Sequence, residues 1–254
     1  MWGAVIGDLA GSVYEFSQIK EVSSVEIDEL IKEESFFSDD TILTVAIADC
    51  LLHDRDYDKY LREYGNKFIS YRPDVTPYFK TSFSPGFIKW LKSSEVGFSI
   101  GNGAMMRISP VGYMCDSLEE VEEESKKACI PSHNSSDAIN CSKIVASIIY
   151  LARNGYSKSE IIELLELDFS YKPFAKFNYT CNDTIGNCLY ALFTSESFED
   201  AIKKVISYGG DTDTNACIVG SMAEALYGVE DRLVEQAKEK IPKEFVKVLE
   251  KAYK

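Results

Sequence analysis

The sequence predicts an all-α protein, because helical periodicity dominates it and alternating strand patterns are scarce. Segments along the whole chain carry apolar residues at three- and four-residue spacing, which is typical of helices with one buried face. The expected helices cover residues 2–16, 41–53, 57–71, 117–130, 136–154, 157–166, 183–194, 197–207, 214–227 and 230–252. A short extended piece could form at 22–27, and the expected irregular stretches are 72–86, 97–113 and 168–182.

The first expected helix carries a stripe of glycines and a polar face. Glycine recurs every four residues, at Gly3, Gly7 and Gly11, which predicts the close approach of a second helix. Asp8 and Glu15 share the polar face of this helix. We expect Asp8 to be a buried residue that hydrogen-bonds between helices or caps a loop. Glu15 comes at the end of the segment, where an acid–base role in a cleft and a plain surface charge are equally open.

The second expected helix is preceded by an acidic cluster, Ser38-Asp39-Asp40-Thr41. Taken alone, the cluster is typical of an N-cap serine followed by carboxylates that the helix dipole favours. Neighbouring helical side chains project about 100° apart. Asp39 and Asp40 would therefore reach two different cations more easily than one shared ion.

Three helices in the middle and second half of the chain have clear start signals. A serine stands directly before each of them, at Ser117, Ser157 and Ser197. Serine is a preferred N-cap because its hydroxyl accepts a hydrogen bond from an amide in the first turn.

A glycine-rich segment, GNGAMMRISPVG at 101–112, lies between the two ends of the chain. Its first two glycines permit positive φ and expose backbone N–H groups, which is how loops hold phosphates. Taken alone, this segment is better interpreted as an ordinary turn. His133 stands just before the helix expected at 136–154, where a capping or packing residue is typical, although an imidazole there could contact a ligand.

A second acidic cluster precedes the helix expected at 214–227, and it reads Gly209-Gly210-Asp211-Thr212-Asp213-Thr214. The glycine pair permits a tight turn that delivers both aspartates from one loop. Buried carboxylates need a compensating charge, and carboxylate and hydroxyl oxygens are the ligands that Mg²⁺ prefers. The two clusters together therefore predict a binuclear Mg²⁺ site, which would tie residues 1–254 into a single domain.

Charge and cysteine content exclude several classes of protein. The chain has 41 acidic and 27 basic residues and a formal net charge of -14, which disfavours nucleic acid and anionic membranes as general partners. Seven cysteines without a C-x-x-C pair predict reduced thiols in a cytoplasmic protein rather than disulfides or a zinc site. The N-terminal segment lacks the basic region of a signal peptide, and no stretch looks apolar enough to span a bilayer.

At the level of whole motifs, the chain resembles the ADP-ribosylglycohydrolases, which include dinitrogenase-reductase-activating glycohydrolase and the ADP-ribosylarginine and ADP-ribosylserine hydrolases. The matching motifs occur in the family's order along almost the whole chain. They are GAVIGDLAGSVYEF, FSDDTILTVAIADCLL, GNGAMMRISPVG, SHNSSDAI and AIKKVISYGGDTDTNACIVGSMAEALYG, of which the last is highly diagnostic. The resemblance implies an all-α, compact orthogonal helix bundle with a binuclear Mg²⁺ centre, in which Mn²⁺ could substitute.

The resemblance also implies roles for individual residues. The implied metal ligands are Ser38, Asp39, Asp40, Asp211, Asp213 and Thr214. Ser38 stands where the family usually has threonine, so the hydroxyl is retained but a methyl that restricts its rotamer is lost. The implied catalytic carboxylates are Glu15, Asp40 and Asp211. The implied ADP-ribose contacts are Asn102, Gly103, Ala104, Met105 and His133.

The implied reaction is hydrolysis of the bond between ADP-ribose and an acceptor, which would reverse ADP-ribosylation. The acceptor could be a protein arginine, a protein serine or a small compound, and the selecting residues are expected within 72–100 and 168–182. Tyr78, Phe79 or Phe83 could stack on adenine. The alternatives are a two-metal phosphoesterase and a non-catalytic ADP-ribose-binding protein. Nothing in the sequence demands a partner subunit, so a monomer is expected.

Overall fold

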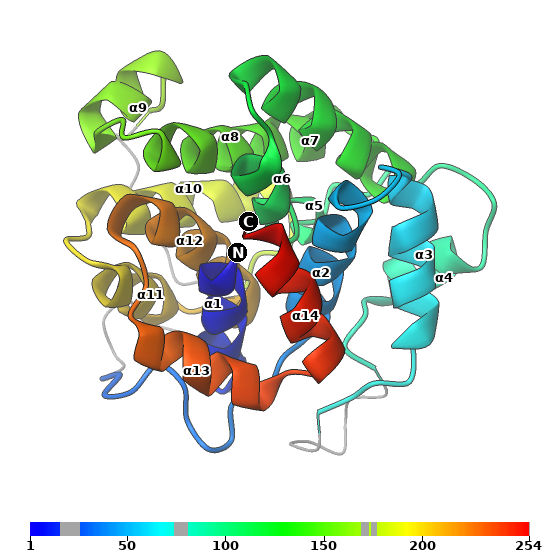
Figure 1. The fold of residues 1–254 in the computed structure, drawn as a ribbon, viewed down its shortest axis with the longest axis horizontal. Coiled ribbons are helices and arrows are strands. Elements are labelled where there is room, and N and C mark those ends of the chain that lie inside the picture. Colours follow the sequence, from blue (N-terminus) through cyan, green and yellow to red (C-terminus); the bar gives the residue numbers. More distant parts are fainter. Residues whose placement is uncertain (16–25, 74–80, 169–172, 174–176, 254) are drawn as a thin grey trace.

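The computed structural model describes residues 1–15, 26–73, 81–168, 173 and 177–253 (Figure 1). These residues form α-helices and no β-strand, which confirms the predicted all-α class. The first half of the chain forms α1 (Trp2–Ser12), α2 (Asp39–Leu51), α3 (Tyr57–Lys67), α4 (Pro85–Leu91), α5 (Gly103–Met106), α6 (Ser109–Met114) and α7 (Leu118–His133). The second half forms α8 (Ser136–Arg153), α9 (Lys158–Leu164), α10 (Cys181–Thr194), α11 (Phe198–Ser207), α12 (Thr212–Tyr227), α13 (Asp231–Lys240) and α14 (Lys243–Ala252).

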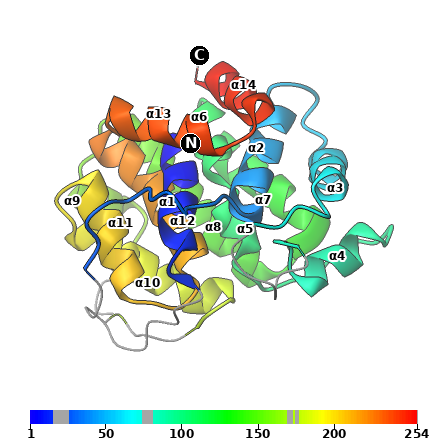
Figure 2. The same cartoon turned by 90° about the horizontal axis from the view of Figure 1, so that it is seen from below.

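Helices α1, α2 and α12 pack together in the middle of the molecule. The same three helices lie next to one another in the two perpendicular views of Figures 1 and 2. Around them, α8, α10 and α11 pack against α12, while α3 and α14 pack against α2. The helices that follow the two acidic clusters are therefore central and not peripheral elements.

The glycine stripe of α1 is the surface on which α12 packs. A Cβ added at Gly7 would lie 2.0 Å from the carbonyl oxygen of Ala216, and one added at Gly3 would lie 2.1 Å from that of Gly220. Distances this short leave no room for a side chain, because the two backbones themselves are in contact. The predicted close approach of a second helix is confirmed.

The serine caps are also confirmed. Ser117, Ser157 and Ser197 each accept a hydrogen bond from the backbone amide three residues further on, at the starts of α7, α9 and α11. Each bond satisfies one of the amides that the first turn of a helix leaves without an intrahelical partner.

Several helix boundaries differ from those expected. The stretch 230–252 forms two helices, α13 and α14, because Pro242 between them cannot continue a helix. The stretch 97–113, expected to be irregular, contains α5 and nearly all of α6, and α4 begins at the end of the stretch 72–86. Ser84 caps α4 and Pro85 starts it, an arrangement that favours a short helix over the expected loop.

The extended piece expected at 22–27 lies mostly outside the described residues, and Glu26 and Ile27 have no regular structure. The only extended pairing in the described part of the chain consists of isolated bridges, Phe98 with His133 and Gly101 with Thr180. No described helix combines the length and the apolar character needed to cross a membrane. A cytoplasmic location stays a prediction.

Candidate metal centre and its cleft

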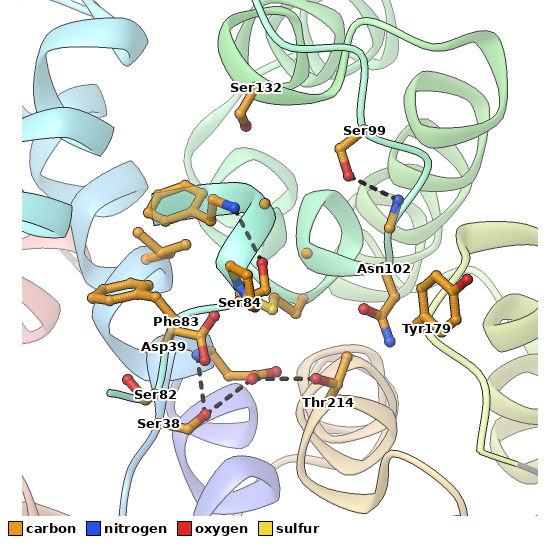
Figure 3. A pocket seen from close by; sticks show the side chains of 18 of the residues that line it. Ser38, Asp39, Ser82, Phe83, Ser84, Ser99, Asn102, Ser132, Tyr179 and Thr214 are labelled. Carbon is orange, nitrogen blue, oxygen red and sulfur yellow. Dashed lines mark hydrogen bonds between the residues drawn. The ribbon is translucent and has the colours of Figure 1, made fainter. Parts of the chain in front are cut away.

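The starts of α2 and α12 meet at the floor of a cleft. Thr214 Oγ1, on α12, donates a hydrogen bond of 3.2 Å to Asp40 Oδ2, on α2. Ser38 Oγ donates to the same carboxylate oxygen over 3.0 Å and accepts from the Asp40 amide over 3.1 Å. Figure 3 shows these contacts, with Ser38 and Asp39 beside Thr214. The two acidic clusters, far apart in sequence, are therefore neighbours in the fold.

The carboxylate of Asp8, on α1, fixes the first turn of α2 through hydrogen bonds. Its Oδ2 accepts hydrogen bonds from the Ser38 amide at 2.9 Å, the Thr41 amide at 3.1 Å and Thr41 Oγ1 at 2.5 Å. Asp8 is therefore the buried hydrogen-bonding residue that its position in the sequence predicts. Its second oxygen, Oδ1, is buried and has no partner among the described residues, and a buried carboxylate oxygen in that state calls for a cation.

Helix α1 is attached to the start of α12 as well. Thr212 Oγ1 donates a hydrogen bond of 2.9 Å to the Gly11 carbonyl, and a Cβ at Gly11 would lie 2.2 Å from the Thr212 carbonyl oxygen. One helix therefore contacts both acidic clusters, α2 through Asp8 and α12 through Gly11.

The carboxylates of the centre form two trios that share one residue. Asp8, Asp40 and Asp213 each offer an oxygen within 4.8 Å of the others, and so do Glu15, Asp211 and Asp213. Oxygen donors grouped at this spacing suit a hard divalent cation. Because Asp213 belongs to both groups, these residues could hold two neighbouring cations. The residues present therefore fit a metal site formed by both acidic clusters.

The electrostatics of the two trios point to the same need for positive charge. Burial raises the pKa of Asp40 and of Asp213 well above the usual range, and repulsion from neighbouring carboxylates raises both further. Burial and the charge of Asp211 raise the pKa of Glu15 to about 8, and burial raises that of Asp8 to about 6. These groups can all be ionised at neutral pH only if a cation offsets their repulsion.

Above this floor opens a cleft of about 1310 Å³, lined by α4, by the loop 97–103 and by the end of α7. Figure 3 shows Ser99 and Ser132 across the cavity from Ser38 and Thr214. Asn102 connects the loop to the floor, because its Nδ2 donates to Asp211 Oδ2 over 2.7 Å. A cleft of this size accommodates a nucleotide-sized ligand.

Comparison with known proteins identifies the family of this chain. The family model described as ADP-ribosylglycohydrolase matches residues 1–253. The chain belongs to the ADP-ribosylglycohydrolase family. It is 25% identical to the ADP-ribosylarginine hydrolase Tri1 of Pseudomonas putida (strain GB-1), over 89% of this chain and 69% of that protein. It is 23% identical to the ADP-ribosylhydrolase ARH3 of Mus musculus, over 90% of this chain and 82% of that protein.

A solved structure shares the fold. The chain superposes on an ADP-ribosylglycohydrolase-related protein complex with a TM-score of 0.74, over 99% of this chain and 96% of that one. The sequence identity of this pair is 17%, so the likeness concerns the fold alone.

Most of the site residues predicted from the sequence of this ADP-ribosylglycohydrolase family member lie together in the cleft. Those that line the cleft are Glu15, Ser38, Asp39, Asp40, Asn102, Gly103, His133, Asp211, Asp213 and Thr214. Ala104 and Met105 do not line it: both are fully buried in α5, and their contact with a ligand stays a prediction. Asp39 is half-buried and belongs to neither trio.

The glycines of the two loops differ in purpose. Gly209 and Gly210 have φ of 74° and 82°, so the expected tight turn before Asp211 does require glycine. Gly101 and Gly103 are not among the residues with positive φ. Gly103 is small for another reason, since a Cβ there would lie 3.3 Å from His133 Nε2.

Arg107 is a site residue that sequence reasoning missed. It lines the cleft, is 1% exposed, and burial lowers its pKa to about 10. The available signal was its position as the single charged residue of the motif GNGAMMRISPVG. Burying a guanidinium group costs free energy unless its N–H donors form hydrogen bonds or ion pairs.

Aromatic rings at the mouth of the cleft were missed as well. Phe98 and Tyr179 line it and are 71% and 64% exposed. Phe83, an expected adenine contact, lines the cleft but is buried and stacks on Phe87. Tyr78 and Phe79, the other two, lie outside the described residues.

Proposed function

We propose that this protein hydrolyses the glycosidic bond between ADP-ribose and an acceptor, in a reaction that depends on two Mg²⁺ ions. The observation that carries the proposal is the pair of carboxylate trios joined at Asp213 on the floor of the cleft. Its relatives support the reaction class, since one is an ADP-ribosylarginine hydrolase and another an ADP-ribosylhydrolase. The acceptor would be a protein arginine or serine, or the non-nucleotide part of a small ADP-ribosyl compound.

The residues that would hold the two ions are Ser38, Asp39, Asp40, Asp211, Asp213 and Thr214, all of which line the cleft. Bound Mg²⁺ would supply Lewis-acid polarisation and a template for the ribose hydroxyls and a water molecule. Mn²⁺ accepts the same oxygen donors and would substitute. Asp8 would stabilise the arrangement through the hydrogen bonds that it accepts from the first turn of α2.

Glu15 is the proposed acid–base residue. It lines the cleft, and its carboxylate belongs to the trio of Asp211 and Asp213. Cleavage of a glycosidic bond needs a group that takes a proton from water or gives one to the departing acceptor. Asp40 and Asp211 are the other carboxylates within reach of that task.

The walls of the cleft fit the remainder of the nucleotide. Asn102, Gly103 and His133 line the cleft and would face the diphosphate. The exposed rings of Phe98 and Tyr179 offer flat surfaces on which adenine could stack. Because the centre draws ligands from both ends of the chain, we also propose that residues 1–254 act as one domain and as a monomer.

Product analysis tests the reaction. The protein is incubated with ADP-ribosylarginine and ADP-ribosylserine peptides, with Mg²⁺ or with EDTA, and the products are separated by chromatography. The proposal predicts intact ADP-ribose in the presence of Mg²⁺ only. Release of AMP would indicate a phosphoesterase instead. Tight binding of ADP-ribose without turnover would indicate a non-catalytic member of the family.

A further inference from the structure

Arg107 and His133 are joined by the hydroxyl group of Ser132. Arg107 Nη2 donates a hydrogen bond of 2.7 Å to Ser132 Oγ, and Ser132 Oγ lies 2.7 Å from His133 Nδ1. The exposed fractions of the three residues are 1%, 3% and 6%. All three line the cleft.

The donors in this chain of contacts have a defined order. A guanidinium carries only donors, so Ser132 Oγ must accept from Arg107. In the described structure, the Ser132 hydroxyl hydrogen has no partner other than His133 Nδ1. Donation from the hydroxyl to Nδ1 uses this hydrogen and places the proton of a neutral ring on Nε2, whereas a ring protonated on Nδ1 would leave the buried hydroxyl hydrogen without a partner.

The second ring nitrogen faces the glycine-rich loop at the edge of the cleft. His133 Nε2 would lie 3.3 Å from a Cβ at Gly103 and 3.8 Å from one at Gly101. The backbone holds the two segments together, since the Gly97 amide donates to the Pro131 carbonyl over 2.8 Å and the Asn134 amide donates to the Gly97 carbonyl over 2.9 Å. The ring is therefore fixed against the loop proposed to contact the diphosphate.

We propose that Arg107 and Ser132 are positioning residues that hold His133 in the tautomer protonated on Nε2, so that the cleft presents a neutral hydrogen-bond donor to a phosphate oxygen. The identity of the phosphate as part of ADP-ribose rests on the proposed function. The proposed tautomer does not rest on it, because it is argued from contacts within the protein alone.

The charge of Arg107 strengthens the arrangement. Burial lowers the pKa of His133 well below its usual range, and the positive guanidinium lowers it further. The imidazole then keeps a single ring proton, and the direction of the Ser132 hydrogen bond selects the nitrogen that carries it. The positive charge next to the ring thus keeps it neutral by disfavouring the imidazolium form.

The composition of the chain makes this tautomer measurable. The sequence contains two histidines, His53 and His133. A long-range ¹H–¹⁵N correlation spectrum of protein labelled at histidine therefore contains two rings, and a His53→Gln variant assigns them. We expect His133 to show a protonated Nε2 and an unprotonated Nδ1.

Ser132→Ala is the decisive variant, because it removes the donor to Nδ1 and leaves the histidine in place. We expect it to mix the two tautomers and to weaken ADP-ribose binding about five- to tenfold, the effect of one hydrogen bond. Ser132→Thr retains the hydroxyl and should restore both properties. Ser125→Ala is the matched control, since Ser125 is a buried serine of the same helix whose hydroxyl has no partner in the described structure.

Arg107→Met tests the first contact of the chain in the same spectrum, with a mixture of tautomers expected. If that variant does not fold, Ser132→Ala alone decides. A wild-type ring protonated on Nδ1 overturns the proposal, and so does a Ser132→Ala protein that keeps both the parent spectrum and the parent affinity. A protein that cleaves no ADP-ribosyl bond would disprove the proposed function, while the spectrum would still decide the tautomer.

Discussion

Asp8 Oδ2 accepts a hydrogen bond of 2.5 Å from Thr41 Oγ1, across the contact between α1 and α2. The same oxygen accepts from the backbone amides of Ser38 and Thr41. A carboxylate that is not itself in the predicted ligand set thus orients the turn that carries Asp39 and Asp40. Loss of a group that hydrogen-bonds to a metal ligand typically lowers metal affinity about 10- to 100-fold.

Removing this hydroxyl should weaken the metal centre. We expect Thr41→Val to lower the free energy of unfolding by about 1 kcal/mol and the affinity for Mg²⁺ by about tenfold. Urea denaturation and titration calorimetry measure the two effects. Thr44→Val is the control, because Thr44 is a buried threonine of the same helix that donates to the Met106 carbonyl instead. Equal Mg²⁺ affinities of the two variants would refute the role given to Asp8.

Asp213→Asn should remove both cations, because Asp213 is the residue that the two trios share. We expect calorimetry to show the loss of both binding events and hydrolysis to fall by at least about 100-fold. Asp183→Asn provides the comparison, since Asp183 is an exposed carboxylate in the first turn of α10. Retention of one full binding event by Asp213→Asn would show that the trios act separately.

Glu15→Gln should separate chemistry from binding. If Glu15 transfers the proton, kcat falls by about 100- to 10,000-fold, while the dissociation constant of ADP-ribose stays within a factor of about two. Rapid-mixing kinetics and calorimetry measure the two quantities. A parallel loss of Mg²⁺ binding would instead identify Glu15 as a ligand of the centre.

The thermal stability of the metal-free protein, kept in EDTA, should decrease as the pH rises. A carboxyl whose folded-state pKa exceeds its unfolded value binds protons more tightly when folded, so its contribution is most favourable at low pH and is lost toward the folded pKa. Burial raises the pKa of Glu15 from 4.5 to about 8 and that of Asp8 from 3.8 to about 6. We therefore expect Tm in EDTA to fall between about pH 5 and about pH 8.

Added Mg²⁺ should reverse this trend. The ions bind the ionised carboxylates, so the increase in Tm caused by Mg²⁺ should be larger at about pH 8 than at about pH 5. Differential scanning fluorimetry at both pH values measures it. An increase that does not depend on pH would mean that the ions bind elsewhere.

Gly7→Ala should destabilise the fold, although alanine normally favours a helix over glycine. Its Cβ would lie 2.0 Å from the Ala216 carbonyl oxygen, so α1 and α12 would have to separate. We expect a loss of about 3 kcal/mol in urea denaturation. Gly86→Ala is the control, because the nearest atom to its added Cβ lies 3.9 Å away. A Gly7→Ala protein as stable as this control would contradict the backbone contact.

Sequence patterns predicted the features that are encoded locally. The caps at Ser117, Ser157 and Ser197 and the glycine stripe of α1 depend on short spacings, and the structure confirms them. The acidic clusters could be paired because buried carboxylates need a common partner. The break at Pro242 was predictable too, but the apolar spacing on both sides concealed it.

Contacts between distant segments could not be predicted in the same way. No spacing within the sequence places Arg107 beside Ser132, since the pairing arises where α5 meets α7. The unpartnered Oδ1 of Asp8 is also a product of the tertiary structure. Asp8 forms a trio with Asp40 and Asp213, and Asp213 is far away in the sequence. The exposed rim of Phe98 and Tyr179 results from two irregular segments, for which periodicity carries no information.

The contact between α1 and α12 has a consequence for ion selectivity. Two bare backbones in contact act as a spacer of fixed thickness, with one ligand cluster attached at each side. In the proposed two-ion centre, the separation of the ligand clusters would be determined by this interhelical distance. Substitutions in this contact, outside the cleft, would then alter which size of metal ion the proposed centre accepts, without changing a single coordinating atom.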